Sequence, residues 1–209
     1  RLGWRAVDTD AVLEADAGIS VPEWFRTRGE ASFRDAERRL LARSLDDEGV
    51  VVACGGGAVV DPGVWGPDLL GRPGTLVVAL DADPETSLRR LQAQQEAEGG
   101  AAERPLLAGG DPLARIRAMK AARLDAYARA ALTLAVDDSA PEQVADDLAW
   151  LVDPGADPDR GECARMAAEQ EQDGVRPANV VLSGSLAFDY IMTFPGSFKD
   201  HILPDKVHV

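Results

Sequence analysis

The sequence has few cysteines and no long apolar run, and both features indicate the cellular compartment in which the protein works. Cys54 and Cys163 are the only cysteines among its 209 residues. No apolar run approaches the length of a membrane-spanning helix. The first residues also lack the charged, apolar and small-residue order of a signal peptide. We therefore expect a protein of the reducing cytoplasm.

Basic residues are scarce as well. The chain has 22 Lys and Arg against 36 Asp and Glu, which gives a formal net charge of -14. Such an acidic protein is not expected to bind nucleic acid or anionic lipid nonspecifically. An anion that binds here must therefore be held by arginines placed locally. The hydrophobic share of 45% is ordinary for a soluble globular protein.

Apolar periodicity divides residues 4–152 into short strands that alternate with longer helices, the pattern of a parallel α/β sheet. The expected strands are Trp4–Val7, Val50–Ala53, Thr75–Leu80 and Leu132–Val136. The expected helices are Thr9–Ala17, Gly29–Arg43, Pro84–Glu98, Asp111–Ala131 and Pro141–Leu151.

The pattern changes after residue 152. The run Asp153–Asp159 is rich in Pro, Gly and Asp, which favour neither helix nor strand, and is interpreted as the start of a linker. A short helix around Glu162–Gln172 and two strands, Asn179–Ser183 and Ala187–Thr193, are expected to follow. This tail has too few residues to bury a core of its own.

Asp8 and Asp10 directly follow the first expected strand, at the edge where open α/β sheets bind ligands. A carboxylate pair in that position can hold a magnesium ion and orient a hydroxyl. The alternative is a helix N-cap followed by an acidic first turn, which needs no ligand. Taken alone, these two residues leave both interpretations open.

Two further motifs each allow a binding role and a structural one. Arg34 and Glu37 lie three residues apart on one helix face, where the carboxylate can fix the guanidinium for bidentate binding of an anion. A surface ion pair is the alternative.

The triplet of Gly55, Gly56 and Gly57 follows a strand, and either lets a ligand approach the main chain or forms a tight turn.

The last candidates lie in the second half of the chain. Arg104 belongs to a Gly-, Ala- and Glu-rich segment, Glu98–Gly110, which is expected either to act as a lid over a phosphate or to be a surface loop. Arg123 and Tyr127 are four residues apart on the next helix. Their alternative is a solvated arginine beside a packed tyrosine.

In their order and spacing these motifs resemble one family. Residues from Asp8 to about Leu151 are similar to shikimate kinase, and six ordered motifs are far more specific than any one of them. The matching pieces are Asp8-Thr9-Asp10, the run from Gly18-Ile19-Ser20 to Trp24-Phe25, the run from Gly29-Glu30 through Phe33-Arg34 to Glu37, Gly55-Gly56-Gly57, Arg104-Pro105-Leu106-Leu107, and Arg123 to Tyr127.

The resemblance implies a P-loop kinase-like fold and a magnesium-dependent transfer of the γ-phosphate of ATP to the 3-hydroxyl of shikimate, in the route to aromatic amino acids. It implies that Asp10 orients the hydroxyl and helps to deprotonate it, and that Asp8 holds Mg2+ through water. Arg104 would neutralise charge on the transferring phosphoryl group. Arg90 would stack near adenine.

The resemblance also assigns the substrate contacts. Arg34 and Arg123 would bind the carboxylate of shikimate from two sides, and Glu37 would lock Arg34 in place. The backbone of the glycine triplet would line the substrate pocket, at Gly55, Gly56 and Gly57.

The sequence departs from the family at two places. The family's glycine-rich loop, with its phosphate-binding Lys and magnesium-binding Ser or Thr, would precede residue 1. We therefore expect that both ends are truncated and that the chain binds ATP poorly and turns over little. The family's usual proline is also missing between Arg123 and Tyr127.

The strand that leads into the missing loop is central in the family's sheet, so its loss predicts a marginal fold. The alternative is that the run Asn179–Ser183 takes the vacant position. Contacts of that run with Trp4–Val7 or with Val50–Ala53 would support this alternative.

The tail resembles a second family. The run from Asn179 to Met192 is similar to the first strand and turn of the ribokinase-like, or PfkB, carbohydrate kinases, in which Asp189 would contact substrate hydroxyls. An ordinary hairpin after a linker is the alternative. The catalytic Gly-Asp motif of that family is missing, so the tail is not expected to do chemistry alone.

Three segments follow from these resemblances: an incomplete kinase-like domain over 1–152, a linker over 153–178, and a partial sugar-kinase start over 179–209. Shikimate kinase is the expected function. The alternatives are another P-loop small-molecule kinase of the gluconate type and a noncatalytic fragment that joins two unrelated reading frames. The expected partner is a small molecule, with no nucleic acid and no membrane, and the expected state is a monomer.

Overall fold

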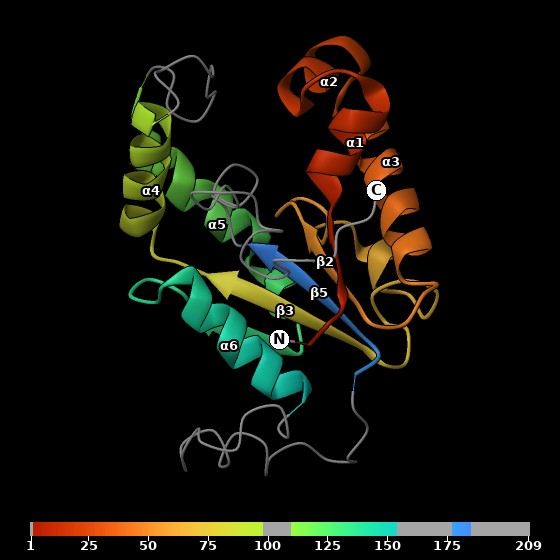
Figure 1. Ribbon diagram of the computed structural model, residues 1–209. Helices are drawn as coiled ribbons and strands as arrows, with labels where there is room; N and C mark the ends of the chain where they lie inside the picture. Colours follow the sequence, from red (N-terminus) through yellow and green to blue (C-terminus); the bar gives the residue numbers. More distant parts are fainter. Residues whose placement is uncertain (1, 98–109, 154–176, 185–209) are drawn as a thin grey trace.

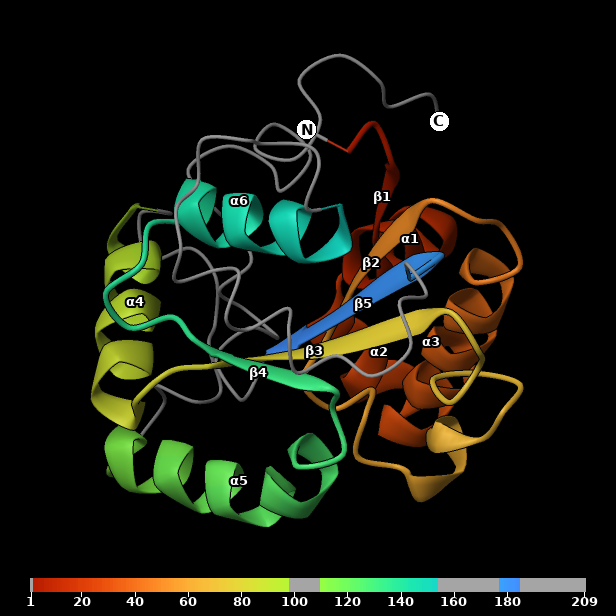
Figure 2. The same cartoon turned by 90° about the horizontal axis from the view of Figure 1, so that it is seen from below.

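The computed structural model describes residues 2–97, 110–153 and 177–184, which form a parallel sheet with helices on both faces (Figure 1 and Figure 2). Five strands lie in the order β1-β2-β5-β3-β4, each parallel to its neighbours. The α/β class and the parallel sheet expected from the sequence are confirmed.

The elements follow the expected alternation of strands and helices. The strands are β1 (Arg5–Asp8), β2 (Val50–Cys54), β3 (Thr75–Asp81), β4 (Leu132–Ala135) and β5 (Asn179–Gly184). The helices are α1 (Thr9–Ala17), α2 (Val21–Arg28), α3 (Glu30–Ser44), α4 (Pro84–Ala97), α5 (Pro112–Tyr127) and α6 (Pro141–Val152), with a 3-10 turn η1 (Pro62–Trp65).

The inner strands are apolar along nearly their whole length. β2 reads Val-Val-Val-Ala-Cys, and all residues of β2 and β5 are buried. A parallel sheet that is covered on both faces buries both sides of each strand, so continuous apolar runs replace the alternation of a half-exposed strand. This is why β-branched runs in the sequence predict the strands well.

The central strand comes from the far end of the described chain. β5 pairs with β2 on one side, where Asn179 lies opposite Val50, and with β3 on the other, where Asn179 lies opposite Thr75. The expected strand Asn179–Ser183 is therefore confirmed, and its pairing with Val50–Ala53 supports the alternative in which this run joins the sheet. Among the described residues, β5 holds the central position of the sheet.

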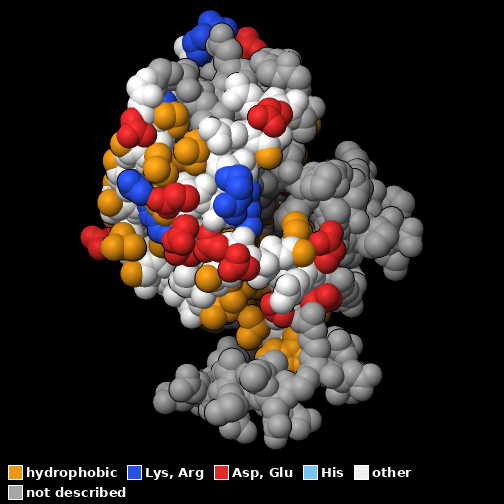
Figure 3. All heavy atoms as spheres, turned by 90° about the vertical axis from the view of Figure 1, so that its left-hand side faces the viewer, with side chains coloured by type: hydrophobic (Ala, Val, Ile, Leu, Met, Phe, Trp, Pro, Cys, Tyr) orange, Lys and Arg blue, Asp and Glu red, His pale blue; other side chains and the backbone are white. Residues whose placement is uncertain are grey.

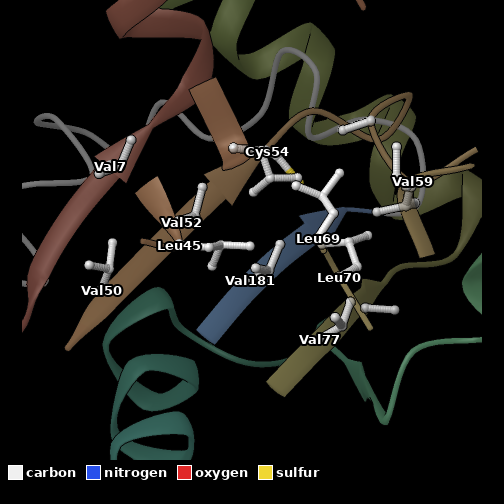
Figure 4. Close-up of a cluster of buried hydrophobic side chains, with 14 of the residues drawn as sticks. Val7, Leu45, Val50, Val52, Cys54, Val59, Leu69, Leu70, Val77 and Val181 are labelled. Carbon is white, nitrogen blue, oxygen red and sulfur yellow. The ribbon is translucent and has the colours of Figure 1, made fainter. Parts of the chain in front are cut away.

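One face of the sheet packs on α3, on the segment around η1 and on the end of α5. Val181 of β5 lies there between Val52 of β2 and Val77 of β3, with Leu45 and Leu70 packed over them (Figure 4). These side chains are at most 4% exposed. They join the middle of the sheet to the helices that carry the candidate site.

The opposite face packs mainly on α6. Val180 and Leu182, which alternate with Val181 along β5, meet Leu148 and Val152 of α6 there. β5 thus contributes to both clusters, as its central position in the sheet requires.

The helix α2 was not expected from the sequence. Ser20 caps it by accepting a hydrogen bond from the Glu23 amide at 3.4 Å, and Pro22 lies in its first turn. The Ser-x-x-Glu spacing and the early proline are the signals that could have predicted this helix.

The helix α5 ends four residues earlier than expected. It stops at Tyr127, and the amide of Ala131 already donates a hydrogen bond of 3.0 Å to the Val77 carbonyl of β3. The apolar periodicity continued past Tyr127, but the chain there turns back to the sheet to begin β4.

None of the helices in the described ranges is long and apolar enough to cross a membrane.

Acidic and basic side chains are interspersed on the face that Figure 3 shows. Exposed ion pairs, such as Arg5 with Asp47 at 2.9 Å, contribute about 0–1 kcal/mol each. The fold therefore depends on its buried apolar clusters rather than on surface charge.

Some expectations lie outside the described residues. They include the helix around Glu162–Gln172, the strand Ala187–Thr193 and most of the linker. The division of the chain into 1–152, 153–178 and 179–209, the monomeric state and the cytoplasmic location stay predictions.

Candidate active-site cleft

The glycine triplet after β2 lies in a crowded part of the sheet edge. A Cβ atom on Gly56 would lie 2.4 Å from the Gly184 carbonyl oxygen and 2.7 Å from the Tyr127 hydroxyl. A Cβ atom on Gly57 would lie 2.1 Å from Nη2 of Arg34. Real Cβ atoms do not approach other atoms so closely. A side chain at Gly56 would therefore collide with the backbone of Gly184, and a side chain at Gly57 would displace the guanidinium of Arg34.

Arg34 is held against this turn by acidic residues of its own helix. Its Nη1 lies 2.8 Å from Oε2 of Glu37, whose side chain is 2% exposed, and its Nη2 lies 3.4 Å from Oε1 of Glu30. The guanidinium carbon is 5.4 Å from the ring centre of Phe33. A buried carboxylate one helical turn away fixes the direction of the guanidinium, so this is not a loose surface ion pair.

Arg123 reaches the same turn from a second helix, α5. Its Nη1 would lie 2.9 Å from a Cβ atom on Gly56. Tyr127, one helical turn later, places its hydroxyl 2.7 Å from the Gly56 carbonyl oxygen and within hydrogen-bond distance of the Gly184 carbonyl oxygen. The end of α5 is thus tied to both β2 and β5.

A cleft of about 430 Å³ opens beside the turn. Its walls include both guanidinium groups, those of Arg34 and Arg123, together with Gly57, Glu37 and Asp61. This volume suits a small ligand. Its lining contains three arginines, Arg34, Arg38 and Arg123, and three carboxylates, Glu30, Glu37 and Asp61, so the cleft offers guanidinium donors to a small anion without a net positive charge.

The aspartates lie at the same edge, one strand away. β1 pairs with β2 so that Asp8 is opposite Ala53, two residues before the glycine triplet. Oδ1 of Asp8 accepts hydrogen bonds from the amides of Asp10 at 3.0 Å and Ala11 at 3.1 Å. Asp8 therefore caps α1, as the structural alternative predicted.

The environment of Asp8 also changes its acidity. Burial raises the pKa of its carboxyl above the ordinary value, and the two backbone hydrogen bonds oppose this shift in part. A carboxylate has two oxygens with several acceptor sites, so capping by Oδ1 is compatible with a second role for this side chain.

No cluster of three His, Cys, Asp or Glu side chains that could hold a metal ion occurs in the described part of the chain. A magnesium ion that is bound mainly through substrate phosphates needs only one or two protein carboxylates. Asp8 and Asp10 fit that smaller requirement.

Arg90 lies at the other side of the sheet, near the end of β4. Its Nη2 donates hydrogen bonds to the carbonyl oxygens of Val136 and Asp137, the second at 3.3 Å. Burial lowers the pKa of its guanidinium from the ordinary value. The amide of Asp83 donates to the Asp137 carboxylate at 2.8 Å and lowers the pKa of that carboxyl.

The structure thus brings part of the predicted site together. Arg34 and Arg123 meet at the glycine triplet, Asp8 and Asp10 lie one strand away, and Arg90 lies at the opposite edge strand. Arg104 and Asp189 lie outside the described residues, so their expected positions stay predictions.

Two polar groups near the site were not singled out from the sequence. Nζ of Lys120 lies 2.8 Å from Oδ1 of Asp81 at the end of β3, and Arg38 pairs with Asp61 at the wall of the cleft. Lys120 precedes Arg123 by three residues, and this spacing places both on one side of α5. The spacing could therefore have indicated that Lys120 lies near the site.

Comparison with known proteins gives one consistent result. The family model described as shikimate kinase matches residues 1–151. A shikimate kinase of Synechococcus sp. (strain CC9605) is 40% identical over 152 residues, which cover 73% of this chain and 71% of the relative. A shikimate kinase of Symbiobacterium thermophilum is 45% identical over 131 residues, covering 63% of this chain and 71% of the relative.

Solved structures agree with the sequence relatives. A shikimate kinase from Bacteroides thetaiotaomicron is 28% identical with a TM-score of 0.57, over 69% of this chain and 80% of that one. A shikimate kinase from Acinetobacter baumannii in complex with shikimate is 26% identical with a TM-score of 0.58, over 72% of this chain and 79% of that one.

Proposed function

The chain belongs to the shikimate kinase family of ATP-dependent phosphotransferases, and from this premise we propose that its cleft binds shikimate for phosphorylation of the 3-hydroxyl. One observation carries the proposal. Arg34 of α3 and Arg123 of α5 both line one small cleft and approach the consecutive residues Gly57 and Gly56 beside it.

This arrangement suits a small carboxylate. Guanidinium groups bind carboxylates through parallel N–H donors, and two of them fix both the position and the orientation of a rigid ring. The buried Glu37 keeps Arg34 in one direction before the ligand arrives, which reduces the ordering cost of binding. The absence of a side chain at Gly56 and Gly57 lets both guanidinium groups approach the turn beside the cleft.

The aspartates are proposed to act on the reacting hydroxyl. Asp10 would orient the 3-hydroxyl and accept its proton as the bond to phosphorus forms. Asp8 would hold Mg2+ through water, and the ion would neutralise phosphate charge during transfer. Asp8 caps α1 and Asp10 lies in its first turn, so both residues lie where β1 meets α1.

Two further arginines are proposed to act on the nucleotide side of the reaction. Arg90 of α4, whose side chain reaches the end of β4, is proposed to lie beside the adenine of ATP, and Arg104 to neutralise the transferring phosphoryl group. Phosphoryl transfer depends on positioning and charge neutralisation, so both roles are electrostatic and orienting.

The printed sequence contains no glycine-rich loop that ends in Gly-Lys-Ser or Gly-Lys-Thr. Such a loop cradles the triphosphate with backbone N–H groups. We therefore propose that the 209-residue chain binds shikimate but releases ADP slowly when ATP is added. The likeness of residues 179–192 to the PfkB carbohydrate kinases stays a prediction, since the matching family model covers residues 1–151.

Isothermal titration of the 209-residue chain tests the substrate. Shikimate is expected to bind, and shikimate methyl ester to bind at least about tenfold more weakly because it lacks the charge that the two arginines recognise. Gluconate, the ligand expected for a gluconate-type kinase, serves as the competitor. Equal binding of shikimate and its ester, or tighter binding of gluconate, would count against the proposal.

A further inference from the structure

The central strand of the sheet joins the fold late in the chain. α6 ends at Val152 and β5 begins at Asn179, yet β5 lies between β2 and β3 (Figure 1). Without β5, the described sheet consists of two separate strand pairs, β1 with β2 and β3 with β4. No other described strand joins these pairs.

Each strand pair carries a different part of the cleft. Gly56 and Gly57 follow β2, and Arg34 meets them from α3, the helix that precedes this strand. Arg123 and Tyr127 lie on α5, which leads into β4. The two arginines therefore meet only when both pairs lie in register along β5.

The space between β2 and β3 that β5 occupies is called the groove below. Specific polar groups of this groove contact the first residues of β5. Oδ1 of Asn179 accepts a hydrogen bond from the Val50 amide at 3.1 Å, and its Nδ2 donates to the Leu45 carbonyl at 3.5 Å. The amide of Ala178 donates to the Gly74 carbonyl at 2.7 Å. The side chain of Asn179 and the amide of Ala178 therefore fix the position at which β5 begins.

The middle and the end of β5 are recognised differently. Val181 is fully buried between Val52 and Val77 (Figure 4). At the end of the strand, the Gly184 carbonyl accepts a hydrogen bond from Tyr127. The groove therefore suits an uncharged, β-branched segment that begins with Asn and ends with a small residue.

We propose that the groove between β2 and β3 is an acceptor for one exchangeable strand, the segment 177–184 of this chain, and that insertion of this strand assembles the cleft. Main-chain pairing on both sides would supply the affinity, and the contacts of Asn179 and Val181 the specificity. The same segment supplied as a separate peptide would take the same position. The link to the cleft rests on the proposed function, whereas the strand acceptor itself does not.

The test uses the full chain with Val181→Asp, which places a charge in the buried centre of β5. The matched control is Thr133→Asp, the same change at an exposed position of the edge strand β4. Hydrogen exchange of the β2 and β3 amides is measured by mass spectrometry. The first variant is expected to exchange at least about tenfold faster in both strands, and the control to match the wild type.

A peptide of residues 176–184 is then added to the Val181→Asp chain. It is expected to restore slow exchange in β2 and β3, whereas a peptide with Asn179→Leu and Val181→Asp is not. Slow exchange in the variant without peptide would overturn the proposal, and so would fast exchange that an excess of peptide leaves unchanged. If Val181→Asp does not yield soluble protein, Asn179→Ala, which removes only the polar contacts, is used under the same criteria.

Shikimate titration of the same samples separates the two proposals. Peptide that restores both slow exchange and shikimate binding supports the strand acceptor and its link to the cleft. Peptide that restores slow exchange in a chain whose wild type does not bind shikimate supports the acceptor and overturns the proposed function. Restored exchange without restored binding, where the wild type binds, overturns the link between β5 and the cleft.

Discussion

The two arginines at the glycine triplet reach it in different ways. Arg34 is directed by Glu37, which lies three residues away on the same helix. On the other side, Tyr127 anchors the helix of Arg123 by contacts with Gly56 and Gly184, which are 71 and 57 residues away in the chain. One side of the cleft is thus built within a single helix, and the other depends on the assembled sheet.

This difference separates two kinds of preorganisation. The Arg34 side contains its own counter-charge, so its geometry forms together with α3 and is lost when that ion pair is broken. The α5 side is held by neutral hydrogen bonds to strand ends, so its geometry responds to anything that moves β2 or β5. Substitutions on the two sides should therefore differ in size and in what they affect.

The largest effect is expected for Arg34→Ala. Removing one guanidinium from a desolvated charge pair costs about 2–5 kcal/mol of binding free energy, so shikimate affinity should fall by two orders of magnitude or so. The buried carboxylate of Glu37 also loses its partner, which should lower the free energy of unfolding by about 3 kcal/mol. Calorimetric titration and urea denaturation measure the two quantities.

The matched control is Arg39→Ala on the same helix. Arg39 pairs with Asp35 at 2.7 Å, but both side chains are more than 60% exposed. We expect a change of less than about 1 kcal/mol in stability and none in shikimate affinity. If both arginine variants bound shikimate as the wild type does, the cleft would not be the substrate site.

The same contrast explains how much the sequence could predict. The Arg34 to Glu37 spacing is local, and the helix period alone places both side chains on one face. The parallel sheet followed from its apolar runs, and the glycine triplet from its place after a strand. These features depend on neighbours within a few residues, so sequence patterns contain them.

The features that the sequence did not predict are long-range. Nothing near Tyr127 indicates that its hydroxyl meets the carbonyls of Gly56 and Gly184, and nothing near Lys120 indicates Asp81. The central position of β5 was raised only as an alternative, because strand order in a sheet is set by packing of the whole chain.

A smaller effect is expected for Glu37→Gln, which keeps the shape of the side chain and removes its charge. Hydrogen bonds to charged groups contribute about 1.5–3 kcal/mol, and the amide retains part of this bond. We expect unfolding at lower urea concentration and weaker shikimate binding than in the wild type, but both changes smaller than for Arg34→Ala. A loss as large as that of Arg34→Ala would mean that the charge of Glu37, not its position, organises the cleft.

Tyr127→Phe tests the long-range side. The variant loses the hydroxyl between the Gly56 and Gly184 carbonyls but keeps the packed ring, so stability should fall by about 0.5–1.5 kcal/mol. Leu124→Ala, on the same helix and 61% exposed, is the control and should stay within about 0.5 kcal/mol of the wild type. Equal stability of all three proteins would show that α5 does not depend on this contact.

The smallest effect is a difference in pH dependence between the two sides of the sheet. Burial raises the pKa of Asp8 above its ordinary 3.8, so the folded state binds more protons there than the unfolded state. This contribution makes the protein less stable as pH rises through the interval between the two values. Asp137, whose pKa is lowered chiefly by the Asp83 amide, contributes stability that is lost as pH falls through its folded value.

Asp8→Asn and Asp137→Asn should therefore change the pH profile in opposite directions. Asn remains a good helix cap, so Asp8→Asn removes the titration while it keeps the start of α1. Its stability relative to the wild type should rise as pH increases above 3.8, the ordinary pKa of the carboxyl, whereas that of Asp137→Asn should fall as pH increases over the acidic range. Urea denaturation across this interval measures both slopes. Slopes of the same sign would show that burial does not dominate at Asp8, because the hydrogen bonds to the amides of Asp10 and Ala11 would then outweigh it.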